Sequence, residues 1–339
     1  MSGDFEVEIL APFRLEPLFV ERIWGTADLR PWYDHVTTGD AVPVGEVWLT
    51  GDASKVATGD SKGKTLAETF AKYSEAMLGP DAAKRMDGQS PLLLKVIFAN
   101  DKLSVQVHPD DKLAQKYGEP RGKTECWYAL AAEPGAEVAA GLLPGVTLED
   151  VERGVADGTL EKSLEVVPIA AGDMVFVDAG TVHAIWPGSV LLETQQNCDL
   201  TYRLFDYGRP RELHVAKALE AICLQTGAGK VAPLVLSDRT VLVDRAYFCV
   251  EAISVDGKRA GETMLSNDET GPGLTYLFAA EGSGVVTSVT EREFSAVELP
   301  VRGIVAVPAS SPAWQIEDLG NLKLIRITPR WPSAAEGAA

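Results

Sequence analysis

Short runs of β-branched and apolar residues, separated by glycine and proline, recur along this chain and limit the folds that it can adopt. The chain has 31 glycines and 20 prolines among its 339 residues. The runs include VGEVWLTG, LSVQVH, DMVFVDAG, TYLFAA, GVVTSV and LKLIRIT. Short strands at such spacing are typical of β-sandwiches and barrels. The sequence therefore predicts a mostly β fold.

Three segments have the pattern of a helix instead. The first covers residues 65–86 and is broken at Gly79-Pro80, and the third covers residues 211–224. The second covers residues 147–164, where Thr147 and Asp150 have the spacing of a capping box. A few inserted helices are therefore expected within the β structure.

The C-terminal part of the chain differs from the rest. After about residue 228 the pattern is almost purely strand and turn, and no histidine follows His214. We therefore expect a β domain without a metal site over residues 229–331. The remaining predicted segments are a first domain over 1–208, a helical connector over 209–228 and a flexible tail over 332–339.

A formal net charge of −18 limits the partners of the chain. Such a surface repels nucleic acid and anionic membranes as a whole. An anionic ligand can bind only where a metal ion or a few Lys and Arg side chains locally reverse the field. No run of 18 apolar residues occurs, and the N-terminus lacks the pattern of a secretory signal. We expect a cytoplasmic protein, monomeric or homodimeric, that binds neither nucleic acid nor membranes.

The segment LSVQVH alternates strictly between apolar and polar residues. Ser104, Gln106 and His108 are predicted on one face of this strand. The other face is predicted to carry Leu103, Val105 and Val107. Such a strand either lies exposed at a sheet edge or lines a polar cavity.

Two later strand-like runs carry further metal-binding side chains. Glu125 lies in GKTECWYAL, where Lys123 shares its face, and His183 follows the Gly turn of GDMVFVDAGTVHAI. Two histidines, a glutamate and a glutamine amide from three strands suit a borderline metal such as zinc. With Zn²⁺ these ligands leave a net charge of about +1, so the site is a Lewis acid that could polarise a sugar carbonyl.

These segments carry a resemblance to a known family. Residues 172–183 resemble the second cupin motif, although Asp178 stands where that motif has proline. LSVQVHPDD, GKTECWY, GTVHAI, ETQQNCDLTYRLFDYGR and RELHVAKALEAI, in this order, resemble type I phosphomannose isomerases. The resemblance begins near Trp24-Gly25 and ends at about residue 224. It implies bicupin-type jelly-roll β-sandwiches with a few helices inserted.

The same resemblance implies an activity and the residues that perform it. The activity is the zinc-dependent interconversion of mannose 6-phosphate and fructose 6-phosphate through a cis-enediol, with one Zn²⁺ per chain and a hexose phosphate as small-molecule partner. The implied zinc ligands are Gln106, His108, Glu125 and His183, and the implied catalytic residue is Arg203. The implied substrate-binding residues are Glu46, Lys95, Ser104, Lys123 and Glu193. One position departs, because some members have an aromatic residue where this chain has Ile185.

The residues alone leave other interpretations open. Arg203 could form an ordinary ion pair with Asp199 or Asp206, and Lys95 could form a buried salt bridge. His35 and His214 are predicted to lie outside the site. The proton-shuttling base stays open between Glu193, a lysine and metal-bound water, and the group that holds the phosphate stays open between Arg203 and Lys123.

Two other functions remain as alternatives. A metal-dependent cupin oxygenase usually presents more histidines to iron and keeps positions open for oxygen, whereas this chain has four histidines in all. A non-catalytic sugar-binding cupin would keep the metal without the reaction. Metal analysis with an oxygen-uptake assay separates the first from an isomerase, and a coupled assay with mannose 6-phosphate separates the second.

Overall fold

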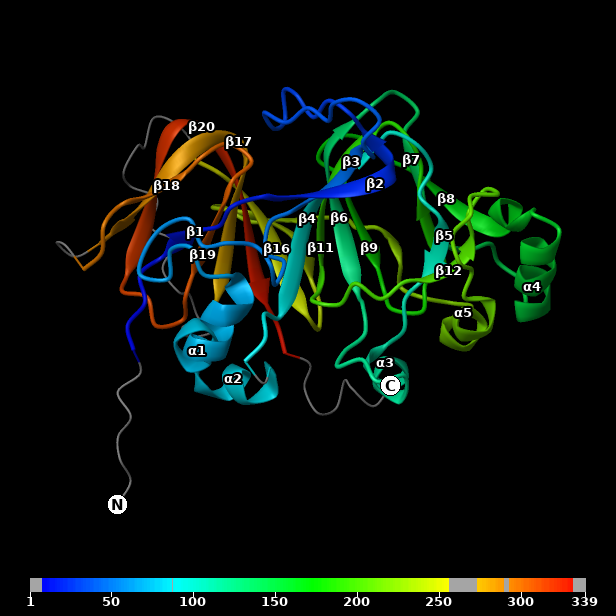
Figure 1. The fold of residues 1–339 in the computed structure, drawn as a ribbon, viewed down its shortest axis with the longest axis horizontal. Helices are drawn as coiled ribbons and strands as arrows, with labels where there is room; N and C mark the ends of the chain where they lie inside the picture. Colours follow the sequence, from blue (N-terminus) through cyan, green and yellow to red (C-terminus); the bar gives the residue numbers. More distant parts are fainter. Residues whose placement is uncertain (1–7, 87, 256–272, 290–292, 332–339) are drawn as a thin grey trace, which may run out of the picture. The chain divides into compact units, whose positions relative to one another are not determined.

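The computed structural model describes residues 8–86, 88–255, 273–289 and 293–331, so the predicted tail over 332–339 lies outside the described residues. The chain forms two compact units that interleave along the sequence (Figure 1). Unit 1 comprises Met1–Leu18, Leu49–Pro91 and Pro233–Ala339, and unit 2 comprises Phe19–Trp48 and Leu92–Ala232. The predicted domain boundaries at residues 208 and 228 stay a prediction.

Unit 1 contains one antiparallel sheet with the strand order β1-β19-β17-β20-β16-β15-β14, and β18 pairs with β17. Its strands are β1 (Phe13–Arg14), β14 (Leu234–Val235), β15 (Thr240–Asp244), β16 (Phe248–Ser254), β17 (Thr275–Ser288), β18 (Val297–Leu299), β19 (Ile304–Val307) and β20 (Trp314–Pro329). Alternate residues of these strands, among them Leu277, Val305 and Leu324, form one buried apolar cluster. The strand-rich pattern after residue 228 is thus confirmed for the described residues.

The first predicted helical segment is confirmed, including its break. Helix α1 (Leu66–Leu78) starts at Thr65, whose side chain accepts from the Glu68 amide while the Glu68 carboxylate accepts from the Thr65 amide. Gly79 ends it, and α2 (Pro80–Met86) follows. Proline at the first position of α2 is favourable because that position needs no amide hydrogen bond.

Unit 2 contains two antiparallel sheets, of seven and five strands. The larger has the order β13 (Gly229–Lys230), β9 (Met174–Val177), β6 (Glu125–Ala132), β11 (Ser189–Gln196), β4 (Leu92–Ala99), β3 (Val44–Trp48) and β2 (Leu18–Thr26). The smaller has the order β12 (Tyr202–Phe205), β5 (Val105–Val107), β10 (His183–Ile185), β7 (Glu137–Leu142) and β8 (Leu164–Pro168). Ile97 and Trp127 from the larger sheet share one buried cluster with Val138 and Ile185 from the smaller. The two sheets therefore pack as a sandwich, and the mostly β prediction is confirmed.

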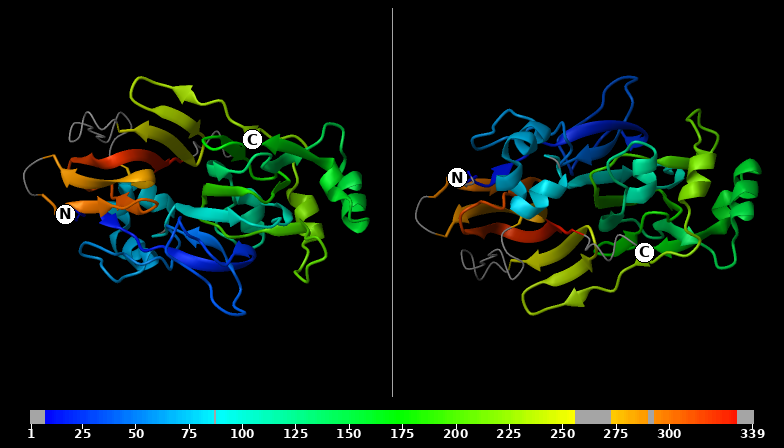
Figure 2. Two further views of the ribbon diagram at one scale, coloured as in Figure 1. Left: turned by 90° about the horizontal axis from the view of Figure 1, so that it is seen from above. Right: turned by 90° about the horizontal axis from the view of Figure 1, so that it is seen from below.

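Helices cover the other face of the smaller sheet. Val105 and Val107 of β5 pack in a second apolar cluster with residues of α4 (Leu148–Ala156), η1 (Leu160–Ser163) and α5 (Val215–Ala221). Figures 1 and 2 show α4 and α5 on the same side of this sheet. Because both faces of β5 are covered, its polar residue Gln106, which is half-buried, faces the space between the two sheets.

Two predicted helices are shorter in the structure than in the sequence pattern. The capping box of Thr147 and Asp150 is confirmed, but the helix predicted over 147–164 stops at Ala156. Gly158, with φ of +67°, turns the chain there before η1 begins. The helix predicted over 211–224 is only α5 (Val215–Ala221). Before it, Arg211 binds Asp206, and the backbone of Glu212 and His214 binds Arg203 instead of continuing a helix. Helix α3 (Asp111–Lys116), capped by Asp110, was not predicted.

Gly25 allows β2 to approach β3, and this gives a test of the packing beside the site. A β-carbon on Gly25 would lie 2.3 Å from the carbonyl carbon of Val44, a backbone atom that cannot turn away. We expect Gly25→Ala to lower the free energy of unfolding by about 1–3 kcal/mol, measured by urea denaturation. Thr26→Ala, at the half-exposed next position, is the control and should change stability by less than about 0.5 kcal/mol. Equal stabilities of the two variants would contradict this account of the strand contact.

Candidate metal centre

Strand β5 directs Gln106 and Ser104 into the space between the two sheets of unit 2. Gln106 pairs with His183 of β10 on one side and with Arg203 of β12 on the other. His108 follows directly after the strand and is buried. The polar face predicted for this segment therefore lines a cavity. One detail was wrong: Leu103 packs in the cluster between the sheets and not with Val105 and Val107, because it precedes the strand.

The larger sheet supplies the acidic partners. Glu125 is the first residue of β6, and Gln195 of β11 pairs with it in register. Two residues along β11, Glu193 pairs with Lys95 of β4. Since alternate residues of a strand share a face, these side chains point to the same side of the sheet.

His108, Glu125 and His183 converge, with one ligand atom of each within 4.8 Å of the others. Nε2 of His183 lies 3.3 Å from Oε1 of Glu125, and Nε2 of His108 lies 3.7 Å from Oε2. The two imidazole rings are 4.8 Å apart between centroids. All three side chains are at most 1% exposed. The structure thus brings together the glutamate and the two histidines, although His108 and His183 lie 75 residues apart in the sequence.

The second ring nitrogen of each histidine is bound to the backbone. Nδ1 of His108 donates to the carbonyl of Leu200 at 2.8 Å, and Nδ1 of His183 donates to that of Thr181 at 2.9 Å. These bonds fix the tautomer in which Nε2 carries a lone pair. Burial, together with the nearby Lys123, lowers the pKa of both imidazoles, that of His183 to about 4. Both rings are therefore neutral, as metal ligands must be.

The Glu125 carboxylate is fully buried, and the described residues offer it too few hydrogen bonds to satisfy it. Burial raises its pKa to about 7 even though Lys123 Nζ lies 2.9 Å from Oε2. Within the described part of the chain, Oε1 accepts no hydrogen bond. A buried carboxylate oxygen without a hydrogen bond is costly, so a ligand that supplies positive charge here is favourable.

Gln106 completes the donor set. Its Nε2 lies 3.2 Å from Nε2 of His183, and its Oε1 accepts from Ser104. Rotation of the amide would bring its oxygen to the same position and let its nitrogen donate to the Ser104 hydroxyl. Two imidazole nitrogens, a carboxylate and an amide oxygen suit a divalent borderline metal. The residues present therefore fit a metal ion.

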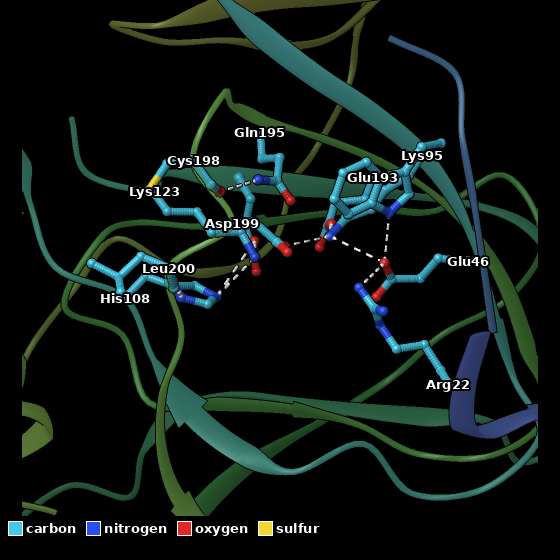
Figure 3. A network of polar contacts seen from close by, with 12 residues as sticks. Arg22, Glu46, Lys95, His108, Lys123, Glu193, Gln195, Cys198, Asp199 and Leu200 are labelled. Carbon is cyan, nitrogen blue, oxygen red and sulfur yellow. Dashed lines mark hydrogen bonds and ion pairs between the residues drawn. The ribbon is translucent and has the colours of Figure 1, made fainter. Parts of the chain in front are cut away.

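A buried ion-pair network lies beside the metal centre (Figure 3). Lys95 Nζ lies 2.8 Å from Glu193 Oε2 and 3.9 Å from both Glu46 Oε2 and Asp199 Oδ1. Glu46 also binds Arg22 at 2.9 Å. Burial opposes the charge of Glu193, but Lys95 and Lys123 outweigh it and lower its pKa to about 2. The same carboxylates raise the pKa of Lys95 against its burial. Lys95 and Glu193 are therefore both charged at neutral pH.

A cavity of about 690 Å³ opens onto this network. Its lining includes Gln106 and every residue predicted to contact substrate, namely Glu46, Lys95, Ser104, Lys123, Glu193 and Arg203. The predicted ligands His108, Glu125 and His183 are buried next to Gln106 and Lys123. A ligand in this cavity would meet both charged side chains and Gln106, which adjoins the other three predicted metal ligands.

Arg203 does not form the ordinary ion pair that the sequence left open. Among the described residues, no carboxylate oxygen lies within salt-bridge distance of it, and Asp206 binds Arg211 instead. Its Nη1 donates to the backbone carbonyl of Glu212 at 2.8 Å. Burial and the neighbouring Arg211 lower its pKa. Arg203 therefore presents an uncompensated positive charge to the cavity.

Sequence similarity agrees with this geometry. The description "Phosphomannose isomerase type I, catalytic domain" belongs to the family model that matches residues 12–143. The mannose-6-phosphate isomerase of Streptococcus mutans is 32% identical over 91% of this chain and 97% of its own length.

The chain belongs to the type I phosphomannose isomerase family.

Other members are similar over most of their length. ManA of Bacillus subtilis, a mannose-6-phosphate isomerase, is 36% identical over 73% of this chain and 80% of its own length. The crystal structure of the mannose 6-phosphate isomerase from Bacillus subtilis superposes with a TM-score of 0.78 at 31% identity, covering 94% of this chain and 99% of that one. The phosphomannose isomerase fold thus extends over both units of the chain, beyond the two-thirds in which motifs could be recognised.

Several residues that line the cavity were not predicted to do so. Arg22, Asp199 and Arg211 line the cavity. No alternating strand pattern like that of LSVQVH marked them in the sequence. A signal for Arg211 existed in the two arginines of YGRPRE, Arg209 and Arg211, but Arg211 was predicted as the first residue of a helix. His214 is outside the cavity lining, as predicted, but its Nδ1 accepts from the backbone amide of Arg203. His35 stacks on Phe19, also away from the site.

Proposed function

We propose that this chain interconverts mannose 6-phosphate and fructose 6-phosphate, and that it uses one Zn²⁺ bound by Gln106, His108, Glu125 and His183. Family membership supports the reaction, and the convergence of two neutral imidazoles on a buried carboxylate supports the metal. The observation that carries the proposal is that this cluster adjoins a cavity lined by charged side chains.

Zinc in this site would supply a Lewis acid at the oxygens of the opened sugar, where it favours the developing negative charge. Its ligands carry one negative charge in total, so the cluster stays positive and attracts an electron-rich oxygen. The chain itself holds the metal ligands rigidly, since both histidines donate to backbone carbonyls. It also keeps the cluster away from bulk water through burial.

Isomerisation requires a proton to move between C1 and C2 while the carbonyl and hydroxyl exchange positions. We propose a cis-enediol as the intermediate on the substrate. Glu193 is one candidate for the base, because it is ionised and lines the cavity. Lys123 and a water molecule are the others. Glu46, Lys95 and Ser104 are proposed to contact the sugar, and Arg203 to act on substrate as the catalytic residue.

The direct test is a coupled assay of metal-replete protein with mannose 6-phosphate and several other hexose phosphates. We expect turnover of mannose 6-phosphate and little of aldoses that lack the phosphate. Turnover of none of them, with metal bound, would leave a non-catalytic sugar-binding cupin as the better description. Oxygen uptake by the iron-loaded protein would instead indicate a cupin oxygenase.

Removal of the metal should abolish activity without unfolding the protein. The sandwich of unit 2 has its own apolar cluster between the sheets, so the metal is not needed to hold it together. After treatment with a chelator we expect no measurable turnover, an unchanged far-ultraviolet circular dichroism spectrum, and recovery of activity when zinc is added back. Loss of the folded spectrum together with the metal would show that the ion is structural.

The remaining expectations concern the setting of the enzyme. Among the helices that the structure describes, none is both long and apolar enough to cross a membrane. We propose a cytoplasmic enzyme, monomeric or homodimeric, whose partner is the hexose phosphate, and that binds neither nucleic acid nor membranes. The net charge of −18 supports the last point.

A further inference from the structure

Five cationic side chains line the cavity, and they differ in how their charge is compensated. Arg22 pairs with Glu46 and Lys95 with Glu193, while Lys123 pairs with Glu125. The other two are Arg203 and Arg211, which come from the same stretch of chain.

Arg211 is fixed by a buried carboxylate. Its Nε donates to Oδ2 of Asp206 at 2.7 Å and its Nη2 donates to Oδ1 at 2.5 Å. Asp206 is 2% exposed, and Tyr207 and Gly208 adopt positive φ angles of 56° and 78° in the turn that follows it. The two bonds use two of the five N–H groups of the guanidinium, and Arg211 lines the cavity.

Arg203 lies against the residue that follows Arg211. Its Nη1 donates to the carbonyl of Glu212, and the amide of His214 donates to the carbonyl of Arg203. The positive charge of Arg211 contributes, after burial, to the lowered pKa of Arg203. Arg203 and Arg211 thus share one region. Asp206 pairs there with Arg211 and, at 3.4 Å, with Arg209, and the exposed Glu212 acts on Arg203, but neither carboxylate lines the cavity. The cavity lining in this region is therefore positive.

The region around Lys95 has the opposite balance. Glu46, Glu193 and Asp199 surround Lys95 and Arg22, so three negative charges face two positive ones (Figure 3). A phosphate dianion would be repelled there, whereas sugar hydroxyls can bind to both kinds of group. Lys123 is already paired with Glu125, next to the metal ligands.

We propose that Arg211 is a further substrate-binding residue, which together with Arg203 binds the phosphoryl group, and that Asp206 is the positioning residue for Arg211. Planar guanidinium groups bind phosphate oxygens in pairs, and two adjacent ones match the charge of a dianion. The inference rests on the proposed function in one respect, that the ligand is a sugar phosphate.

The test compares binding of a phosphorylated and an unphosphorylated acyclic analogue, sorbitol 6-phosphate and sorbitol, by calorimetry on the metal-loaded protein. Loss of a charged hydrogen-bond donor predicts that Arg211→Gln weakens binding of sorbitol 6-phosphate about 10- to 100-fold and leaves that of sorbitol unchanged. Asp206→Asn should also weaken the binding of sorbitol 6-phosphate, by a smaller factor, and leave the binding of sorbitol unchanged. A merely structural role of Asp206 would affect both ligands alike.

The matched control is Arg30→Gln, because Arg30 also binds an aspartate, Asp28, through two nitrogens but lies outside this cavity. It should bind both ligands as the unmodified protein does. Undiminished binding of sorbitol 6-phosphate by Arg211→Gln would overturn the proposal. If that variant does not fold, Arg211→Lys decides: we expect about fivefold weaker binding because lysine lacks the planar pair of donors, and unchanged affinity overturns the proposal.

This inference and the proposed function can fail separately. An active isomerase whose Arg211→Gln variant keeps its KM and its affinity for sorbitol 6-phosphate overturns the inference alone. A protein without isomerase activity, in which the same variant loses affinity for sorbitol 6-phosphate, overturns the proposed reaction and supports the phosphate site.

Discussion

Replacing His108 with alanine is expected to remove bound zinc and isomerase activity together. The substitution deletes one of two imidazole ligands and leaves the buried Glu125 next to Lys123 and His183. Even residues that only orient a metal ligand contribute about 10- to 100-fold to metal affinity, so loss of a ligand should exceed this. Since a Lewis acid contributes several kcal/mol to such a reaction, we expect kcat/KM to fall by at least roughly 1000-fold.

The measurement pairs metal analysis of dialysed protein with the mannose 6-phosphate assay. His35→Ala is the matched control, because His35 is a histidine of unit 2 that stacks on Phe19 away from the metal centre. It should keep one zinc per chain and full activity. A His108→Ala protein that retained stoichiometric zinc would mean that the ion binds elsewhere, and full activity without zinc would mean that the reaction does not use it.

Replacing Arg203 with alanine is expected to reduce turnover strongly while zinc stays bound. Arg203 lines the cavity, and its strand β12 pairs with β5 at Gln106. Removal of one preorganised charge that acts on the substrate costs roughly 100- to 1000-fold in rate. Arg203→Lys should recover part of this loss, because it restores the charge without the planar donors.

Metal content separates this effect from that of His108→Ala. Arg153→Ala is a suitable control, since Arg153 is an exposed arginine of α4 that binds Asp150 outside the cavity. Both arginine variants should contain one zinc, and only Arg203→Ala should lose activity. Normal turnover by Arg203→Ala would remove Arg203 from the catalytic machinery, and loss of zinc would assign it a structural role at the metal centre.

Strand periodicity predicted the metal centre more fully than it predicted its surroundings. Ser104, Gln106 and His108 share a face because side chains alternate along a strand, and this local rule needs no knowledge of the fold. The pairing of Gln106 with His183 is different, since 77 residues separate the two positions. Only the resemblance to the family linked them, because register between distant strands is decided by the packing of the whole sandwich.

The features of the fold and the site that the sequence did not predict are determined by tertiary contacts. The pattern of RELHVAKALEAI favours a helix, yet Arg211 binds Asp206 and the helix begins only at Val215. Likewise, Leu103 fits the alternation of its strand but packs between the sheets because the strand begins at Val105. Lys95 gave a signal, a lysine within an apolar run, but its three carboxylate neighbours come from segments far apart in the sequence.

The segment from Asp199 to Arg203 joins three parts of the site that would otherwise be independent. Asp199 faces Lys95, the carbonyl of Leu200 orients His108, and Arg203 reaches the cavity. Because the three contacts lie at fixed positions within five residues, an insertion or deletion between them would displace at least one of them. Divergence within this stretch should therefore proceed by exchange of side chains, while insertions and deletions accumulate in the connecting loops.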